Sequence, residues 1–154
     1  MAHDGVARAL VGELKFRGTL AVADVMAAQI AANAPPGLLD GACLVPVPTH
    51  PSRRRARGFD QASLVAGRLR RRGAGPVVAC LVRADGGARQ LGAGRAGRRA
   101  ADRLDVRAVG RVPARVALVD DVHTTGATLD ACASALRRAG AQRVVALTYT
   151  RTLP

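Results

Sequence analysis

The chain has 154 residues, of which 49% are hydrophobic, and its formal net charge is +13. This length favours one domain, residues 1–154, with a single core that buries most of the chain. Phe16, Phe59 and Tyr149 are the only aromatic residues, which argues against a protein that binds single-stranded nucleic acid by stacking bases on aromatic rings.

The N-terminal part of the sequence, residues 1–37, has the pattern of a helical segment. We expect a first helix in VARALVGELKFRG, ending at Gly18, and a second in LAVADVMAAQIAAN, which the Pro-Pro-Gly sequence at 35–37 ends. The apolar face predicted for the first helix consists of Val6, Leu10, Leu14 and either Phe16 or Arg17.

Residues 43–154 alternate between short apolar runs and helical patterns. The expected strands lie at 42–48, 76–82, 105–109, 115–122 and 143–149, and the expected helices at 60–73 and 127–140. The strands are apolar on both faces, as strands of a parallel sheet covered by helices must be. The fold class that follows is α/β, an open and mainly parallel sheet flanked by helices, with an N-terminal helical segment.

A glycine- and arginine-rich segment from Arg83 to about Asp102 interrupts this alternation and shows no periodicity. It is too long for an ordinary connection between elements. Such segments in compact domains are usually functional lids or disordered.

The basic residues are unevenly distributed along the chain. Of the 24 lysines and arginines, 17 lie between Arg53 and Arg115, a stretch with only four aspartates. Such a field concentrates nucleic acids, nucleotides or pyrophosphate near the surface, although any single arginine is more simply explained as part of a solvated face. We expect an anionic partner for the cluster as a whole.

The cysteines and histidines do not predict a metal site. Cys43, Cys80 and Cys132 are scattered in apolar runs without a C-x-x-C pair, and the three histidines fall at no spacing typical of metal ligands. Buried thiols in a reducing cytoplasm are the simplest interpretation. No apolar run approaches the length of a transmembrane helix, so we expect no membrane insertion.

The stretch VALVDDVHTTGAT, residues 116–128, carries the strongest functional pattern. Asp120 and Asp121 stand at the end of a buried strand, where open parallel sheets bind ligands. Adjacent carboxylates there can accept hydrogen bonds from vicinal hydroxyls or hold a divalent cation. The residues that follow lead into a helix N-terminus, which favours a phosphate; they are Thr124, Thr125, Gly126, Ala127 and Thr128. A ribose 5-phosphate combines a diol with a phosphate.

The same stretch fits two other interpretations. An Asp-Asp pair after a strand also occurs in metal-binding NTPases, but the chain contains no G-x-x-x-x-G-K-[ST] loop. Thr-Thr-Gly can also be a plain helix N-cap. That interpretation leaves two adjacent charges at a buried strand end without an explanation.

At this point the sequence resembles a known family. VALVDDVHTTGAT looks like the phosphoribosyl pyrophosphate (PRPP) binding signature of type I phosphoribosyltransferases. LVPVPTHPSRRRARGFDQASLVAGRLRR is similar to a segment typical of the ComF family, with Asp60 where that family has asparagine. LKFRG and RQLGAGRAGRR resemble two further segments of the family, so that the resemblance extends from Ala7 onward.

The resemblance implies roles for individual residues. Asp120 and Asp121 would take the ribose hydroxyls and the bridging Mg²⁺, and residues 124–128 would take the 5′-phosphate. The turn formed by Pro48, Thr49 and His50 would be the pyrophosphate loop, with Arg53 and Arg57 as counter-charges. The segment 89–99, with Arg95 and Arg98 as candidate catalytic cations, would be the flexible catalytic loop. His50 could equally just orient the turn, and His123 is expected to be exposed and inert.

The sequence also departs from the family pattern. ComF-type proteins commonly begin with a cysteine-rich zinc-binding segment, which the 154 residues lack; a naturally short member and a misassigned start would both explain this. No segment obviously forms the hood that selects the acceptor base in well-studied phosphoribosyltransferases, and only the N-terminal helices could serve.

Two functions therefore remain open. The first is Mg²⁺-dependent transfer of ribose 5-phosphate from PRPP to an unidentified acceptor base. The second is a non-catalytic protein that binds PRPP or a nucleotide, or associates with single-stranded DNA in competence, through phosphate contacts. The N-terminal helices are a candidate homodimer face.

Overall fold

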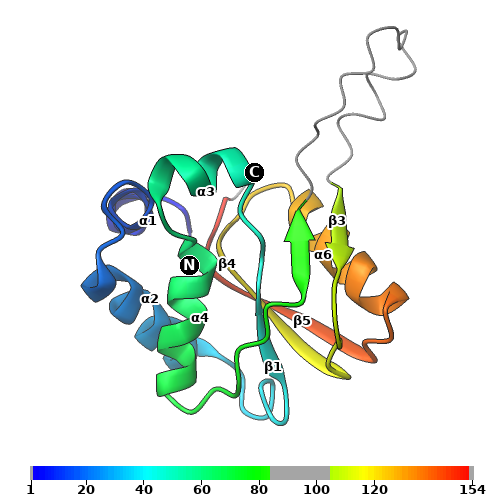
Figure 1. Cartoon of the computed structure of the whole chain (residues 1–154). Coiled ribbons are helices and arrows are strands. Elements are labelled where there is room, and N and C mark those ends of the chain that lie inside the picture. The colour runs from blue at the N-terminus through cyan, green and yellow to red at the C-terminus, as the bar shows by residue number, and fades with distance from the viewer. Residues whose placement is uncertain (1, 84–104, 153–154) are drawn as a thin grey trace, which may run out of the picture.

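The computed structural model describes residues 2–83 and 105–152, which form an open α/β sheet with helices on both faces (Figure 1). Three parallel strands make the main sheet in the order β1 (Cys43–Pro46), β4 (Arg115–His123) and β5 (Arg143–Arg151). A separate antiparallel pair joins β2 (Leu81–Arg83) to β3 (Val106–Ala108). The predicted α/β fold class is confirmed.

Helices cover the main sheet on both sides. One side carries the N-terminal helices α1 (Gly5–Arg17) and α2 (Leu20–Asn33) together with α4 (Gln61–Arg71). The other side carries α6 (Ala127–Arg138) and the β2–β3 pair. A short helix, α3 (Pro51–Arg57), follows β1. The predicted N-terminal helical segment is present.

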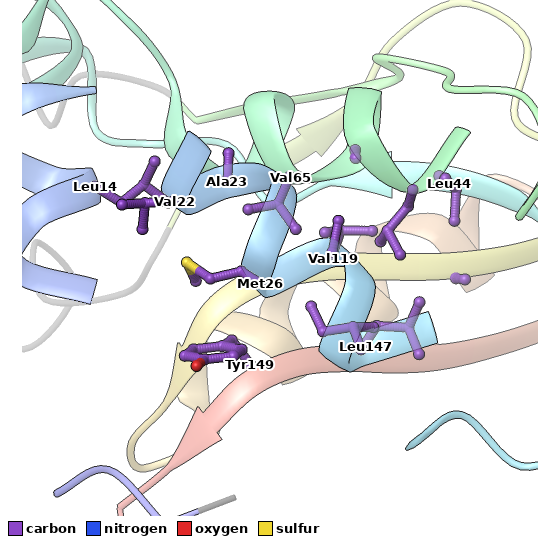
Figure 2. Close-up of a cluster of buried hydrophobic side chains, with 14 of the residues drawn as sticks. Leu14, Val22, Ala23, Met26, Leu44, Val65, Val119, Leu147 and Tyr149 are labelled. Atoms are coloured by element: carbon purple, nitrogen blue, oxygen red, sulfur yellow. The ribbon is translucent and has the colours of Figure 1, made fainter. Parts of the chain in front are cut away.

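The central strand β4 is buried on both faces. Ala117 and Val119 pack into the core beneath α2 and α4, where Figure 2 labels Val119, whereas Val116 and Leu118 pack beneath α6. All four side chains are at most 1% exposed. Because successive side chains of a strand point to opposite faces, a continuous apolar run is what this position in the sheet requires.

The apolar face predicted for the first helix was wrong in part. Val6 is 77% exposed and Phe16 84% exposed, and the buried residues of α1 are Ala7, Val11 and Leu14. Phe16 follows Ala7 by nine positions, about two and a half helical turns, so it lies on the opposite side of α1. The i, i+4, i+7 spacing of the buried set defines the face that packs on the molecule.

Two further elements differ from the sequence-based expectation. The strand predicted at 76–82 is divided: Val77 forms a single bridge beside β1, and the regular strand β2 begins only at Leu81. The helix α3 was not predicted, although Pro51 at its first position is a typical helix-start feature; the side chain of His50 caps it.

The three cysteines are free thiols, and the predicted burial holds for two of them. Cys80 and Cys132 are buried and Cys43 is half-buried. Burial raises the pKa of the Cys132 thiol to about 12, which keeps it protonated. Within residues 2–83 and 105–152, no helix has the length and apolar character needed to cross a bilayer.

Candidate functional site

A polar cavity of about 280 Å³ lies at the carboxyl ends of β1 and β4. The two strands are parallel neighbours, with Pro46 opposite Val119, so the segments that follow them meet at one edge of the sheet. Among the residues predicted for the site, nine line this cavity: Pro48, Thr49, His50, Arg53, Arg57, Asp120, Asp121, Thr124 and Thr128.

Hydrogen bonds to the start of α4 hold the segment after β1 in place. The backbone N–H of Thr49 donates to Oδ2 of Asp60 at 3.2 Å, and the Thr49 hydroxyl donates to Oε1 of Gln61 at 3.2 Å. Asp60 also caps α4, because its Oδ1 accepts from the backbone N–H of Ser63 at 2.8 Å. Asp60 thus connects the turn after β1 to α4.

His50 caps α3, a helix that carries two of the basic residues lining the cavity. Its Nδ1 accepts from the backbone N–H of Ser52 at 3.3 Å. This contact fits the orienting role considered for His50. Arg53 and Arg57 follow on α3 and line the cavity on this side.

The two carboxylates lie inside β4, three and two residues before its last residue. Oδ1 of Asp120 accepts from the backbone N–H of Asp121 at 2.8 Å. Burial, and then the charge of Asp121, raise the pKa of Asp120 to about 7, although the nearby Lys15 ammonium acts in the opposite direction. Asp121 is itself buried, and its Oδ2 lies 3.1 Å from Nζ of Lys15. One carboxylate therefore has a cation beside it, and the other readily takes up a proton.

The turn between β4 and α6 leads directly into the helix N-terminus, as the sequence predicted. Gly126 is the N-cap residue with a φ of +82°, a conformation that glycine adopts without strain. The backbone N–H of Ala127 donates to the Thr125 hydroxyl at 3.4 Å. Gly126 borders a smaller adjoining cavity of about 30 Å³, whereas Thr125 and Ala127 line neither space.

His123 differs from its expected position. It was expected to be exposed and inert, but it is half-buried. A side chain added at Gly126 would place its Cβ 3.1 Å from Nε2 of His123. The imidazole thus packs against Gly126 and leaves little room for a larger side chain at that position.

Arg95 and Arg98, the predicted catalytic cations, lie outside the described residues, as does the predicted loop 89–99. The structure adds polar residues to the cavity that the residue patterns had not placed there, namely His3, Lys15, Gln61 and Arg83. LKFRG and RGFDQA contain two of them, but the sequence gives no distance between these motifs and the Asp-Asp pair. Only the tertiary fold brings them together.

The fold and the cavity define an α/β open-sheet protein with a polar, mixed-charge pocket at the carboxyl ends of two parallel strands. No protein-family model matches the sequence, and no curated protein matches it. Among solved structures, the chain is similar to one described as the allosteric regulatory enzyme of purine biosynthesis, with 22% identity and a TM-score of 0.47 over 82% of this chain. The match spans 24% of that chain. Membership of the ComF family stays a prediction.

Proposed function

We propose that this protein is a phosphoribosyltransferase-like protein that binds PRPP in the 280 Å³ cavity and transfers ribose 5-phosphate to an acceptor base. The observation that carries the proposal is the meeting of three sets of groups in one cavity. These are the carboxylates of β4, the threonines around the start of α6 (Thr124 before it and Thr128 in its first turn), and the turn after β1 with two arginines of α3. PRPP presents a diol, a monophosphate and a pyrophosphate, one group for each set.

The reaction exchanges one bond at C1 of the ribose. A nitrogen lone pair of the base forms the new C–N bond, the electron pair of the C1–O bond leaves with pyrophosphate, and the base loses its proton to solvent. Negative charge grows on the leaving group, so positive charge placed beside it lowers the barrier. Arg53 and Arg57 would supply that charge, while Asp120 and Asp121 would hold the ribose hydroxyls.

The carboxylates fit a magnesium ion that arrives with the substrate. Among the described residues, no three acidic, histidine or cysteine side chains come together to hold a metal. Mg²⁺ is commonly held by one or two carboxylates together with substrate phosphates and water. Asp120 and Asp121 would provide the protein's share, and the bound ion would add positive charge at the leaving pyrophosphate.

Calorimetric titration with PRPP and Mg²⁺ tests binding. Wild-type protein should release or absorb heat, and the double variant Asp120→Asn, Asp121→Asn should not. Asp130→Asn, an exposed carboxylate on α6 outside the cavity, is the control and should bind like wild type. Equal binding by the double variant would contradict the proposed site. Catalysis is then assayed as pyrophosphate release with a panel of bases; binding without release across a broad panel would favour the non-catalytic alternative.

A second candidate function is association with single-stranded DNA. The observation that favours it is the exposed row Arg53, Arg54 and Arg55 on α3, next to the cavity. With few aromatic residues for stacking, such binding would depend on phosphate contacts, and its affinity would fall steeply as salt rises. Fluorescence anisotropy with a labelled oligonucleotide at 50 and 200 mM salt tests this, and no binding at the lower salt would exclude it.

A further inference from the structure

Helix α1 forms a wall of the cavity through a single side chain. Lys15 lines the cavity together with the two carboxylates, and its Nζ lies 3.1 Å from Oδ2 of Asp121. The Lys15 side chain is 31% exposed and that of Asp121 is 11% exposed. The ammonium is therefore held at the boundary between the buried carboxylate and the open cavity.

Contacts at both ends of α1 fix this position. Before the helix, the backbone N–H of His3 donates to the carbonyl oxygen of Arg151 at 2.9 Å, and the His3 ring hydrogen-bonds the Thr150 hydroxyl at 2.9 Å. After the helix, Gly18 packs so closely on the Phe59 ring that a Cβ there would lie 2.7 Å from the ring. Lys15 thus projects from a helix tied to β5 and to the segment before α4.

The chemistry of the ammonium group suits it to bind a ligand as well as Asp121. An ammonium has three N–H donors and no acceptor. The contact with Oδ2 of Asp121 can use one of these donors, which leaves the others for a ligand in the cavity. Lys15 is the only lysine in the chain. Its compact ammonium on a flexible stem can turn toward a ligand, whereas the planar guanidinium of an arginine requires partners in its own plane.

We propose that Lys15 is a ligand-binding residue of this cavity and that its ammonium donates simultaneously to Asp121 and to an oxygen of a phosphorylated sugar. This inference rests on the proposed function, because it takes PRPP as the ligand. It makes the N-terminal helix part of the binding site. It also gives LKFRG a direct contact with the substrate.

The test compares Lys15→Met, Lys15→Arg and Arg17→Met with wild type by calorimetric titration with PRPP and Mg²⁺. Arg17→Met is the matched control: it removes one positive charge from the same helix, and Arg17 pairs with Glu13 outside the cavity. Lys15→Met should weaken PRPP binding about ten- to hundredfold, the range expected for a hydrogen bond to a charged group. Lys15→Arg should recover part of the loss, and Arg17→Met should bind within about threefold of wild type.

Thermal unfolding of the ligand-free variants shows whether each one is folded. If Lys15→Met is unfolded, the folded Lys15→Arg variant decides, because a planar guanidinium cannot place its donors where the compact ammonium has them and should still weaken binding. If Lys15→Met is folded and binds PRPP as tightly as wild type, the inference alone is overturned. If Lys15→Met is unfolded, the same result in the folded Lys15→Arg variant overturns it. An equal loss in Arg17→Met would do the same. A wild-type protein that binds neither PRPP nor inorganic pyrophosphate would overturn the proposed function and the inference together.

Discussion

Asp120 should make the ligand-free protein less stable as the pH rises. Its pKa is raised from 3.8 to about 7, first by burial and then by the charge of Asp121. The groups that face it are Asp121 on the same strand, the Lys15 ammonium from α1 and the Cys132 thiol from α6. Because the folded state prefers the protonated carboxyl, this group stabilises the fold fully below pH 3.8 and loses that contribution as the pH rises through 7.

The size of the effect follows from proton linkage. At pH 5 the carboxyl is protonated in the folded protein and ionised in the unfolded chain, whereas at pH 8 it is ionised in both. The pH 5 value lies two pH units below the folded-state pKa, which at about 1.4 kcal/mol per unit gives a loss of about 3 kcal/mol of unfolding free energy between pH 5 and pH 8. That is a large fraction of the stability of a small domain.

Replacing Asp120 with asparagine should remove this pH dependence. The amide oxygen can still accept from the backbone N–H of Asp121, so the local hydrogen bond is retained. Urea unfolding at pH 5 and pH 8, with EDTA present, gives the free energy of unfolding of wild type and of Asp120→Asn. The contributions of the other titrating groups cancel in the difference between the two proteins. The difference should change by about 3 kcal/mol in favour of the variant at the higher pH.

Asp130→Asn alters an exposed carboxylate on α6 and should follow the wild-type profile. If wild type and Asp120→Asn lose the same free energy between pH 5 and pH 8, the carboxyl does not titrate in this range and the reasoning fails. If the carboxyl does titrate in this range, Asp120→Asn should be more stable than wild type at pH 8 but bind PRPP poorly, since a binding site commonly costs stability.

Glycines and ligand binding give further measurable outcomes. Gly18→Ala should lower the free energy of urea unfolding by about 1–3 kcal/mol, because φ is +61° there and the new Cβ meets the Phe59 ring. Gly12→Ala, inside α1 with open space around it, should raise it by about 0.5–1 kcal/mol. Gly126→Ala should weaken PRPP binding at least tenfold in calorimetry, while Gly140→Ala, strained alike but with open space around its Cβ, should not. PRPP with Mg²⁺ at about 100 times its Kd should stabilise wild type by about 2.7 kcal/mol in the same unfolding assay; an unchanged midpoint would contradict binding.

Patterns within single elements could be predicted from the sequence. The apolar run of β4 indicated a strand buried on both faces, and the turn after the Asp-Asp pair indicated the start of the next helix. Both depend on neighbours along the chain. The pairing of β1 with β4 is seen only in the structure, but once the two strands are parallel neighbours, the segments that follow them must lie at the same edge of the sheet.

Features that depend on contacts between distant segments could not be predicted. Lys15 reaches Asp121 across more than a hundred residues of sequence, and no local pattern encodes that distance. The face of α1 was misassigned because Val6 and Phe16 are apolar yet exposed, and hydrophobicity alone does not show which side of a helix a neighbour covers. The short helix α3 has no buried residue, so it lacks the apolar periodicity on which helix prediction depends.

The charges in the cavity explain why two adjacent carboxylates can stay in this fold without a ligand. Repulsion between like charges at a partly buried site would be costly if both were ionised and unpaired. Asp121 has the Lys15 ammonium beside it, and Asp120, with its pKa of about 7, takes up a proton near neutral pH. A ligand displaces the proton of Asp120 more easily than the Lys15 ammonium. Sugar hydroxyls or a divalent cation beside Asp120 favour its ionised carboxylate. Under the proposed function, PRPP and Mg²⁺ would therefore displace a proton from Asp120 but leave Lys15 in place beside the ligand.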